Sequence, residues 1–142
     1  MSLADPSRKM SKSYGPEHYI GLMEDEGSIY RKIRSAVTDM GLRPGQEMSP
    51  GVANLFLLLE LVAPNELVED FREKHRAGKL LYKDLKETLY KHLMEFLAPI
   101  RERRRELEAR GEIRDILAAG AERARVIARE VIGEVRERVG LS

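Results

Sequence analysis

Apolar side chains recur at intervals of three and four residues along most of the chain, which is the spacing that places them on one face of an α-helix. The first such helix is predicted from about Gly27 to Asp39. Asp25 or Ser28 is expected to cap its start, because short polar side chains accept hydrogen bonds from free N–H groups. Gly41 is expected to end it, since glycine tolerates the backbone that follows a helix.

The next predicted helix, Val52–Ala63, is apolar on nearly every side. Ser49 is expected to be its N-cap and Pro50 its first residue, since a first-turn residue needs no N–H donor. Asn54 is the polar exception, and we expect it to hydrogen-bond a neighbouring backbone or side-chain group. The pattern predicts a central, buried helix.

Further helices follow in the second half of the chain. A short one is predicted over Pro64–Gly78, and then a long one with a stripe of leucines that Pro99 should kink. After a break at Gly111, a short helix over Ile113–Ala119 is expected to end at Gly120. The last helix repeats an apolar residue every four positions: Ile127, Val131, Val135 and Val139. The predicted fold class is therefore all-α, a bundle of five or six helices.

The first 16 residues show no helical period and contain prolines, a glycine and four serines, which predicts a mobile loop. We give no structural weight to Met1–Leu3. The run Tyr19–Met23 is too short to assign and is read as either a short strand or an extended link.

Composition excludes several classes of protein. The 25 basic and 24 acidic residues leave a net charge of +1, so any contact with nucleic acid has to use a local patch, and we expect no DNA partner. The chain has no cysteine, and His18, His75 and His92 are scattered, so no metal site is expected. No apolar run is long enough for a bilayer and no secretory signal opens the chain, which predicts a cytoplasmic protein without a membrane segment.

Candidate chemistry lies in the loop, in the pentapeptide Lys9-Met10-Ser11-Lys12-Ser13. Two ammonium groups and two hydroxyls within five residues can lay cations and hydrogen-bond donors along a polyphosphate. The alternative, which the pentapeptide alone leaves open, is a solvated Ser/Lys linker.

The pentapeptide resembles the second signature sequence of the class I aminoacyl-tRNA synthetases, and its surroundings are similar to the C-terminal part of bacterial tryptophanyl-tRNA synthetases. The similar blocks keep their order along residues 4–142: Asp5-Pro6, Tyr19-Ile20-x-Leu22-x-x-Asp25, Ile29-x-x-Lys32-Ile33-x-x-Ala36-Val37-Thr38-Asp39, Pro50-Gly51-Val52-x-Asn54-Leu55, Leu97-x-Pro99-Ile100-x-x-Arg103, Leu117-x-x-Gly120-Ala121-x-x-Ala124 and Gly140-Leu141.

The resemblance also shows what is missing. The family's nucleotide-binding fold, its first signature and its tryptophan pocket have no counterpart here. We therefore interpret the chain as a fragment, with residues 1–24 as the signature loop and tail of a catalytic domain and residues 25–142 as a helical anticodon-binding domain. The fragment alone is expected to be inactive and to bind no cofactor, whereas the full-length enzyme is expected to be a homodimer.

The resemblance implies ATP with Mg²⁺ as a substrate and a tryptophan-specific tRNA as a partner. Lys12 would hold the departing pyrophosphate and Lys9 would support it. Ser11 and Ser13 would complete the phosphate contacts, and Met10 would pack the loop against the body of the enzyme.

A second candidate site is the basic stretch after Pro99. Arg101, Arg104 and Arg105 can share one helix face and form a surface that follows the phosphates of an RNA stem. The alternative is a solvated helix held by internal Glu–Arg pairs.

Two rival functions remain at this point. One is a tyrosyl-type or other class I synthetase fragment, although the tyrosyl relatives usually vary the signature toward Lys-Phe-Gly-Lys-Ser. The other is a helical adaptor or RNA-binding module without catalysis, which would hold a protein partner on the Val52–Ala63 surface.

Overall fold

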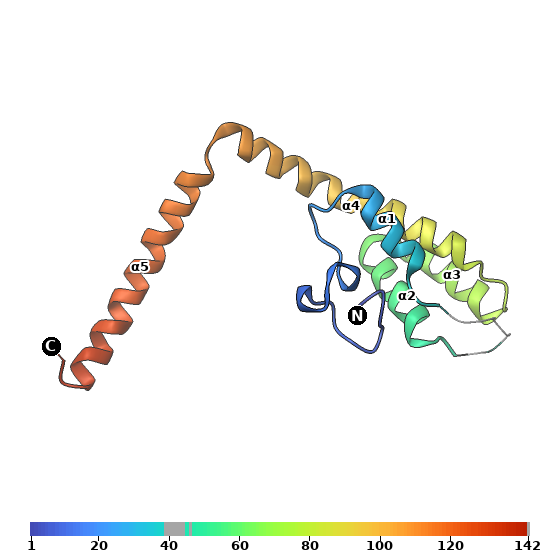
Figure 1. The fold of residues 1–142 in the computed structure, drawn as a ribbon, viewed down its shortest axis with the longest axis horizontal. Helices are drawn as coiled ribbons and strands as arrows, with labels where there is room; N and C mark the ends of the chain where they lie inside the picture. Colours follow the sequence, from blue (N-terminus) through green and yellow to red (C-terminus); the bar gives the residue numbers. More distant parts are fainter. Residues whose placement is uncertain (39–44, 46, 142) are drawn as a thin grey trace. The chain divides into compact units, whose positions relative to one another are not determined.

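The computed structural model describes residues 1–38, 45 and 47–141 of the chain. In this part, every regular element is helical and there is no strand, so the predicted all-α class is confirmed (Figure 1). The elements are two 3₁₀ turns and five helices: η1 (Lys12–Tyr14), η2 (Pro16–His18), α1 (Glu26–Ser35), α2 (Pro50–Val62), α3 (Asn65–Arg76), α4 (Tyr82–Arg110) and α5 (Ile113–Arg138).

The chain divides into two compact units, Met1–Arg101 and Glu102–Ser142. The first contains the N-terminal loop, α1 to α3 and most of α4. Its core draws side chains from all four helices and from the N-terminal segment: Leu3, Ile29, Ile33, Ala36, Val52, Leu55, Phe56, Leu59, Val68, Phe71, Leu80, Leu85, Leu89 and Leu97.

Helix α1 begins as expected but ends early. The Asp25 carboxylate accepts the Ser28 N–H at 2.8 Å and caps the start. The helix ends at Ser35, four residues short of the predicted Asp39, because the backbone turns extended at Ala36 and the Val37 N–H donates to the Leu3 carbonyl at 3.1 Å. The predicted stop at Gly41 lies outside the described residues.

Helix α2 confirms the predicted cap and corrects the predicted burial. Ser49 Oγ accepts the Val52 N–H at 3.3 Å, and Pro50 is the first helical residue. One face of α2 is buried in the core, but Leu57 and Leu61 are 56% and 74% exposed. The prediction of burial on all sides is therefore wrong, because the other elements of the unit cover only one face.

The first three residues are part of the folded unit, which the sequence did not predict. Ser2 and Leu3 are buried. The side chain of Asn54 donates to the carbonyls of Met1 and Ser2 at 3.0 and 3.1 Å, which confirms that this buried amide is hydrogen-bonded to groups that lie beside it in the fold. The segment after η2 has no strand assigned: it is extended at Tyr19 and then turns at Leu22 and Met23, where the Glu24 N–H donates to the Gly21 carbonyl at 3.1 Å.

The last two helices include one predicted boundary that is wrong. Helix α4 continues through Pro99 and ends before Gly111, whose φ of 69° favours glycine. Helix α5 then runs through Gly120 without a break, so the predicted short helix ending there is wrong. Alanines precede and follow Gly120, and their helix propensity offsets the cost of one glycine. No residue of α5 is buried, and no helix in the described ranges is long and apolar enough to cross a membrane.

Candidate functional site

The Lys9–Ser13 segment adopts a defined turn. Ser11 has an extended backbone, and its Oγ accepts the Ser13 N–H at 3.3 Å, which caps η1. The Gly15 N–H closes the turn on the Lys12 carbonyl at 3.2 Å. Gly15 itself has φ 99°, a conformation that side chains disfavour, so the turn requires glycine at its end.

The side chains of this segment divide between solvent and core. Lys9, Lys12 and Ser13 are exposed, whereas Met10 is half-buried and packs against the core of the first unit. Lys12 Nζ lies 5.9 Å from the centroid of the Tyr19 ring, within the range of a cation–π contact. The arrangement presents two cations on an anchored turn, as a binding site for phosphate groups requires.

A third cation lies on the approach to this turn and was missed in the sequence analysis. The guanidinium of Arg8 lies 5.1 Å from the centroid of the Tyr14 ring, and its Nε lies 3.2 Å from Asp5 Oδ2. Hydrogen bonds from the Ser7 hydroxyl and N–H lower the pKa of Asp5 below its ordinary value, so this carboxylate stays charged. Its attraction reduces the positive charge that Arg8 adds to the turn.

Residues 19–25 form the link from the turn to α1, and side chains of two helices hold it in place. Lys32 Nζ, on α1, donates to the Tyr19 carbonyl at 3.0 Å. Arg101, on α4, donates from Nε to the Leu22 carbonyl at 2.9 Å and from Nη2 to the Glu24 carbonyl at 2.8 Å. These contacts satisfy backbone acceptors that a short irregular segment leaves without partners.

The carboxylate of Glu24 pairs with Lys32 and also binds the link itself. It lies 2.5 Å from Lys32 Nζ and also accepts the Ser28 hydroxyl and the Gly21 N–H. Burial opposes the charge on Glu24, but the hydrogen bonds from Lys32, Ser28 and Gly21 outweigh it and lower the pKa of this carboxyl. A charged pair is therefore kept at the base of the loop.

The three arginines of the predicted RNA surface have different surroundings. Arg101 binds the link just described, and its side chain is 16% exposed. Arg104 and Arg105 are exposed and belong to the second unit, where Arg104 Nε lies 2.7 Å from Glu108 Oε1. The ion pairs Arg104–Glu108 and Arg103–Glu106 are of the kind expected if this stretch is a solvated helix held by internal Glu–Arg pairs.

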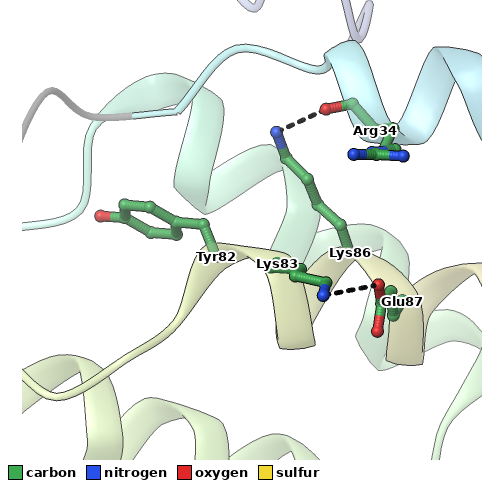
Figure 2. Close-up of a pocket in the computed structure, with 5 residues that line it drawn as sticks. All are labelled: Arg34, Tyr82, Lys83, Lys86 and Glu87. Carbon is green, nitrogen blue, oxygen red and sulfur yellow. Dashed lines mark hydrogen bonds and ion pairs between the residues drawn. The ribbon is translucent and has the colours of Figure 1, made fainter.

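A basic pocket between α1 and α4 was not predicted from the sequence. Its volume is about 260 Å³, and it is lined by Arg34, Tyr82, Lys83, Lys86 and Glu87 (Figure 2). Figure 2 shows Lys86 reaching to the Arg34 carbonyl and Lys83 directed at Glu87; the distances are 2.9 and 3.9 Å. Burial lowers the pKa of Lys86.

The size and lining of this pocket limit what it can hold. It is smaller than the roughly 300–1,000 Å³ typical of pockets for whole small molecules. Lys86 also donates to the Ala36 carbonyl at 2.8 Å, so its ammonium is committed to the end of α1. The exposed cations of the lining are Arg34 and Lys83, and the aromatic side chain of Tyr82 lines the same pocket. This combination suits one phosphate or one base of a single strand.

No group of three His, Cys, Asp or Glu side chains in the described part of the chain lies close enough to hold a metal ion. The candidate chemistry in the first unit consists of cations and hydroxyls on a capped turn, together with a separate basic pocket.

Residues 1–98 match the family model described as tRNA synthetases class I (W and Y), and the chain belongs to this family. Its relatives include a tryptophan–tRNA ligase of Halalkalibacterium halodurans, 37% identical over 99% of this chain and 43% of the relative. That of Aquifex aeolicus is 38% identical over 94% of this chain and 34% of the relative.

Solved structures agree with this assignment. A tryptophanyl-tRNA synthetase from Mycoplasma pneumoniae gives a TM-score of 0.74 at 30% identity and covers 100% of this chain and 45% of that one. The enzyme from Campylobacter jejuni, complexed with ADP and tryptophan, gives 0.72 at 26% identity, over 99% of this chain and 44% of that one. The chain thus spans less than half the length of these relatives.

Proposed function

We propose that this chain supplies the ATP-phosphate loop and the RNA-binding helical part of a tryptophan–tRNA ligase. The observation that carries the proposal is the capped Lys9–Ser13 turn, anchored by Met10 on a helical core. Its support is the match to tryptophan–tRNA ligases over nearly the whole chain, together with a related structure that binds ADP and tryptophan.

The proposed reaction has two steps. A carboxylate oxygen of tryptophan attacks the α-phosphorus of ATP, the bond from that phosphorus to the β-phosphate oxygen breaks, and pyrophosphate leaves with the electron pair. The tryptophanyl group of the adenylate is then transferred to a ribose hydroxyl at the end of the tRNA, and AMP is released. In the first step the protein mainly positions the groups and stabilises charge on the leaving pyrophosphate.

In this mechanism, Lys12 stabilises the negative charge that builds on the pyrophosphate oxygens. Lys9 adds a weaker contact, and the hydroxyls of Ser11 and Ser13 with nearby N–H groups bind the remaining oxygens. Mg²⁺ enters with ATP as part of the substrate. The 142 residues alone are not expected to form the adenylate, because the reaction also needs a tryptophan pocket and a site for the α-phosphate.

We assign residues 1–24 to the loop and tail of the catalytic domain, and residues 25–142 to binding of the anticodon region of a tryptophan-specific tRNA. The pocket between α1 and α4 is the better candidate contact, because two exposed cations, Arg34 and Lys83, and the aromatic Tyr82 line one cavity. Arg104 and Arg105 provide a second candidate surface. The full-length enzyme is proposed to act as a homodimer in the cytoplasm.

The test is amino-acid-dependent exchange of labelled pyrophosphate into ATP by the full-length protein. The proposal requires exchange with tryptophan and far less with tyrosine. Exchange with tyrosine instead would support the tyrosyl-type alternative. Exchange with neither amino acid would reject the ligase and favour the adaptor, for which the exposed Leu57 and Leu61 on α2 would be the docking surface.

A further inference from the structure

The link between the signature turn and α1 carries an arrangement that the proposed chemistry does not use. Within a few residues, the carbonyls of Tyr19, Leu22 and Glu24 each accept a hydrogen bond from a cationic side chain. The two cations, Lys32 and Arg101, come from α1 and α4, which are far apart in sequence. A surface link that needs only to connect two elements has water available for these carbonyls.

Lys32 is buried, with its side chain only 3% exposed. A buried ammonium is costly unless it is paired and hydrogen-bonded, and here the Glu24 carboxylate at 2.5 Å supplies the pair. Glu24 is fixed in turn by the Ser28 hydroxyl at 2.5 Å and the Gly21 N–H at 3.0 Å. The position of Lys32 Nζ relative to the link is therefore tightly determined.

Tyr19 connects this arrangement to the turn. Its carbonyl accepts from Lys32, and its ring centroid lies 5.0 Å from Lys32 Nζ. Lys12 Nζ lies 5.9 Å from the same ring centroid. The buried lysine and the signature lysine thus contact one aromatic side chain, whose backbone is held by the buried lysine.

We propose that Lys32, fixed by Glu24 and acting with Arg101, is a positioning residue for Lys12. It holds Tyr19 in place, and Tyr19 in turn holds the Lys12 ammonium by a cation–π contact, so that Lys12 keeps a fixed position relative to the helical core. The inference rests on the proposed function. Small displacements matter at such a site, because misplacing a catalytic group by about 1 Å costs roughly a hundredfold in rate.

The test uses the full-length protein and the tryptophan-dependent exchange of pyrophosphate. The variant combines Lys32→Met with Glu24→Gln, which removes the pair without leaving a buried charge unpaired. We expect kcat to fall about ten- to hundredfold while the KM for ATP changes less than about twofold, since the ground-state phosphate contacts remain. The matched control is Arg72→Met, which removes the ion pair between Arg72 on α3 and Glu60 on α2, remote in sequence from the link.

A double-mutant cycle with Lys12→Ala shows whether the pair acts through Lys12. If it does, the double substitution costs less than about twofold in a Lys12→Ala background, because the group that it positions is already gone. Equal costs in both backgrounds, or a cost matched by Arg72→Met, would overturn the inference and identify the pair as structural.

Tyr19→Leu provides a second route if the first variant fails to fold. It removes the ring but keeps the backbone carbonyl, and it is expected to lower kcat, whereas Tyr19→Phe keeps the ring and is expected to retain wild-type kcat. Equal activity of the two variants would contradict the role of Tyr19. A wild-type protein without any exchange would instead reject the proposed function itself, so the two failures are distinguishable.

Discussion

Gly51 lies directly against the backbone of Val37. A Cβ at Gly51 would come within 2.9 Å of the Val37 carbonyl carbon and would overlap its oxygen. Val37 also donates its N–H to the Leu3 carbonyl at 3.1 Å. Three segments therefore meet here: the first turn of α2, the chain after α1 and the start of the N-terminal loop. Only glycine at position 51 allows their backbones to approach this closely.

Gly51→Ala is accordingly expected to destabilise the first unit. Because backbone atoms have to move, we expect the free energy of unfolding to fall by roughly 1–3 kcal/mol, as for other overpacked sites. Urea unfolding of the full-length protein measures the change.

Gly120→Ala is the matched control. This glycine lies inside α5 with no neighbouring atom within 4 Å of an added Cβ. Alanine should leave stability unchanged or raise it by about 0.5–1 kcal/mol, since it lowers the entropy cost of the helix. Similar losses at both positions would contradict the close approach at Gly51.

Glu24→Gln is expected to change how stability depends on acid. The pKa of Glu24 is lowered in the folded protein from an ordinary value of 4.5, so its charged form stabilises the fold above that pH. This contribution is lost as the pH falls through the folded pKa. The free-energy difference between wild type and variant should therefore be largest near neutral pH and shrink below about pH 4.5. A difference that is constant from pH 7 to pH 3 would show that Glu24 acts without its charge.

Arg34→Glu combined with Lys83→Glu is expected to weaken tRNA binding by the full-length protein. If both cations of the pocket contact phosphates, the salt dependence of the affinity should lose about one unit of slope per contact. Filter binding or anisotropy over a range of salt concentrations measures both quantities. The control reverses Arg31 and Lys91, which are exposed on the same two helices but do not line the pocket.

An equal loss in the control would mean that general charge, rather than the pocket, attracts the RNA. Reversal of Arg104 and Arg105 completes the comparison. A larger effect there than in the pocket would return the RNA contact to the basic stretch after Pro99.

Local chemistry explains which features the sequence predicts correctly. The Ser49 cap, the Pro50 start and the Asp25 cap depend on neighbouring residues only, and the structure contains all three. The end of α1 depends on Leu3, which lies 34 residues from Val37, and no local pattern reports such a contact. Glycine generally weakens a helix, which is why a stop was predicted at Gly120, but α5 continues on both sides of it.

The candidate sites show the same difference between features set by neighbouring residues and features set by contacts that are distant in sequence. The lysines of the turn are adjacent in sequence, so the pentapeptide could be recognised as one motif. Arg101 was grouped with its sequence neighbours, whereas its actual contacts are on the link, at Leu22 and Glu24. The pocket joins Arg34 to Lys83 across the fold, and neither residue stands out in the sequence.

Lys12→Ala in the full-length protein tests the central claim most directly. Adenylate formation from tryptophan and ATP is measured in single turnovers, together with the dissociation constant for ATP. We predict that the rate of the chemical step falls by about 10²–10³ with little change in ATP binding, as is typical when a group that stabilises transition-state charge is lost. Equal losses in rate and binding, or an unchanged rate, would contradict the role of this loop in releasing pyrophosphate.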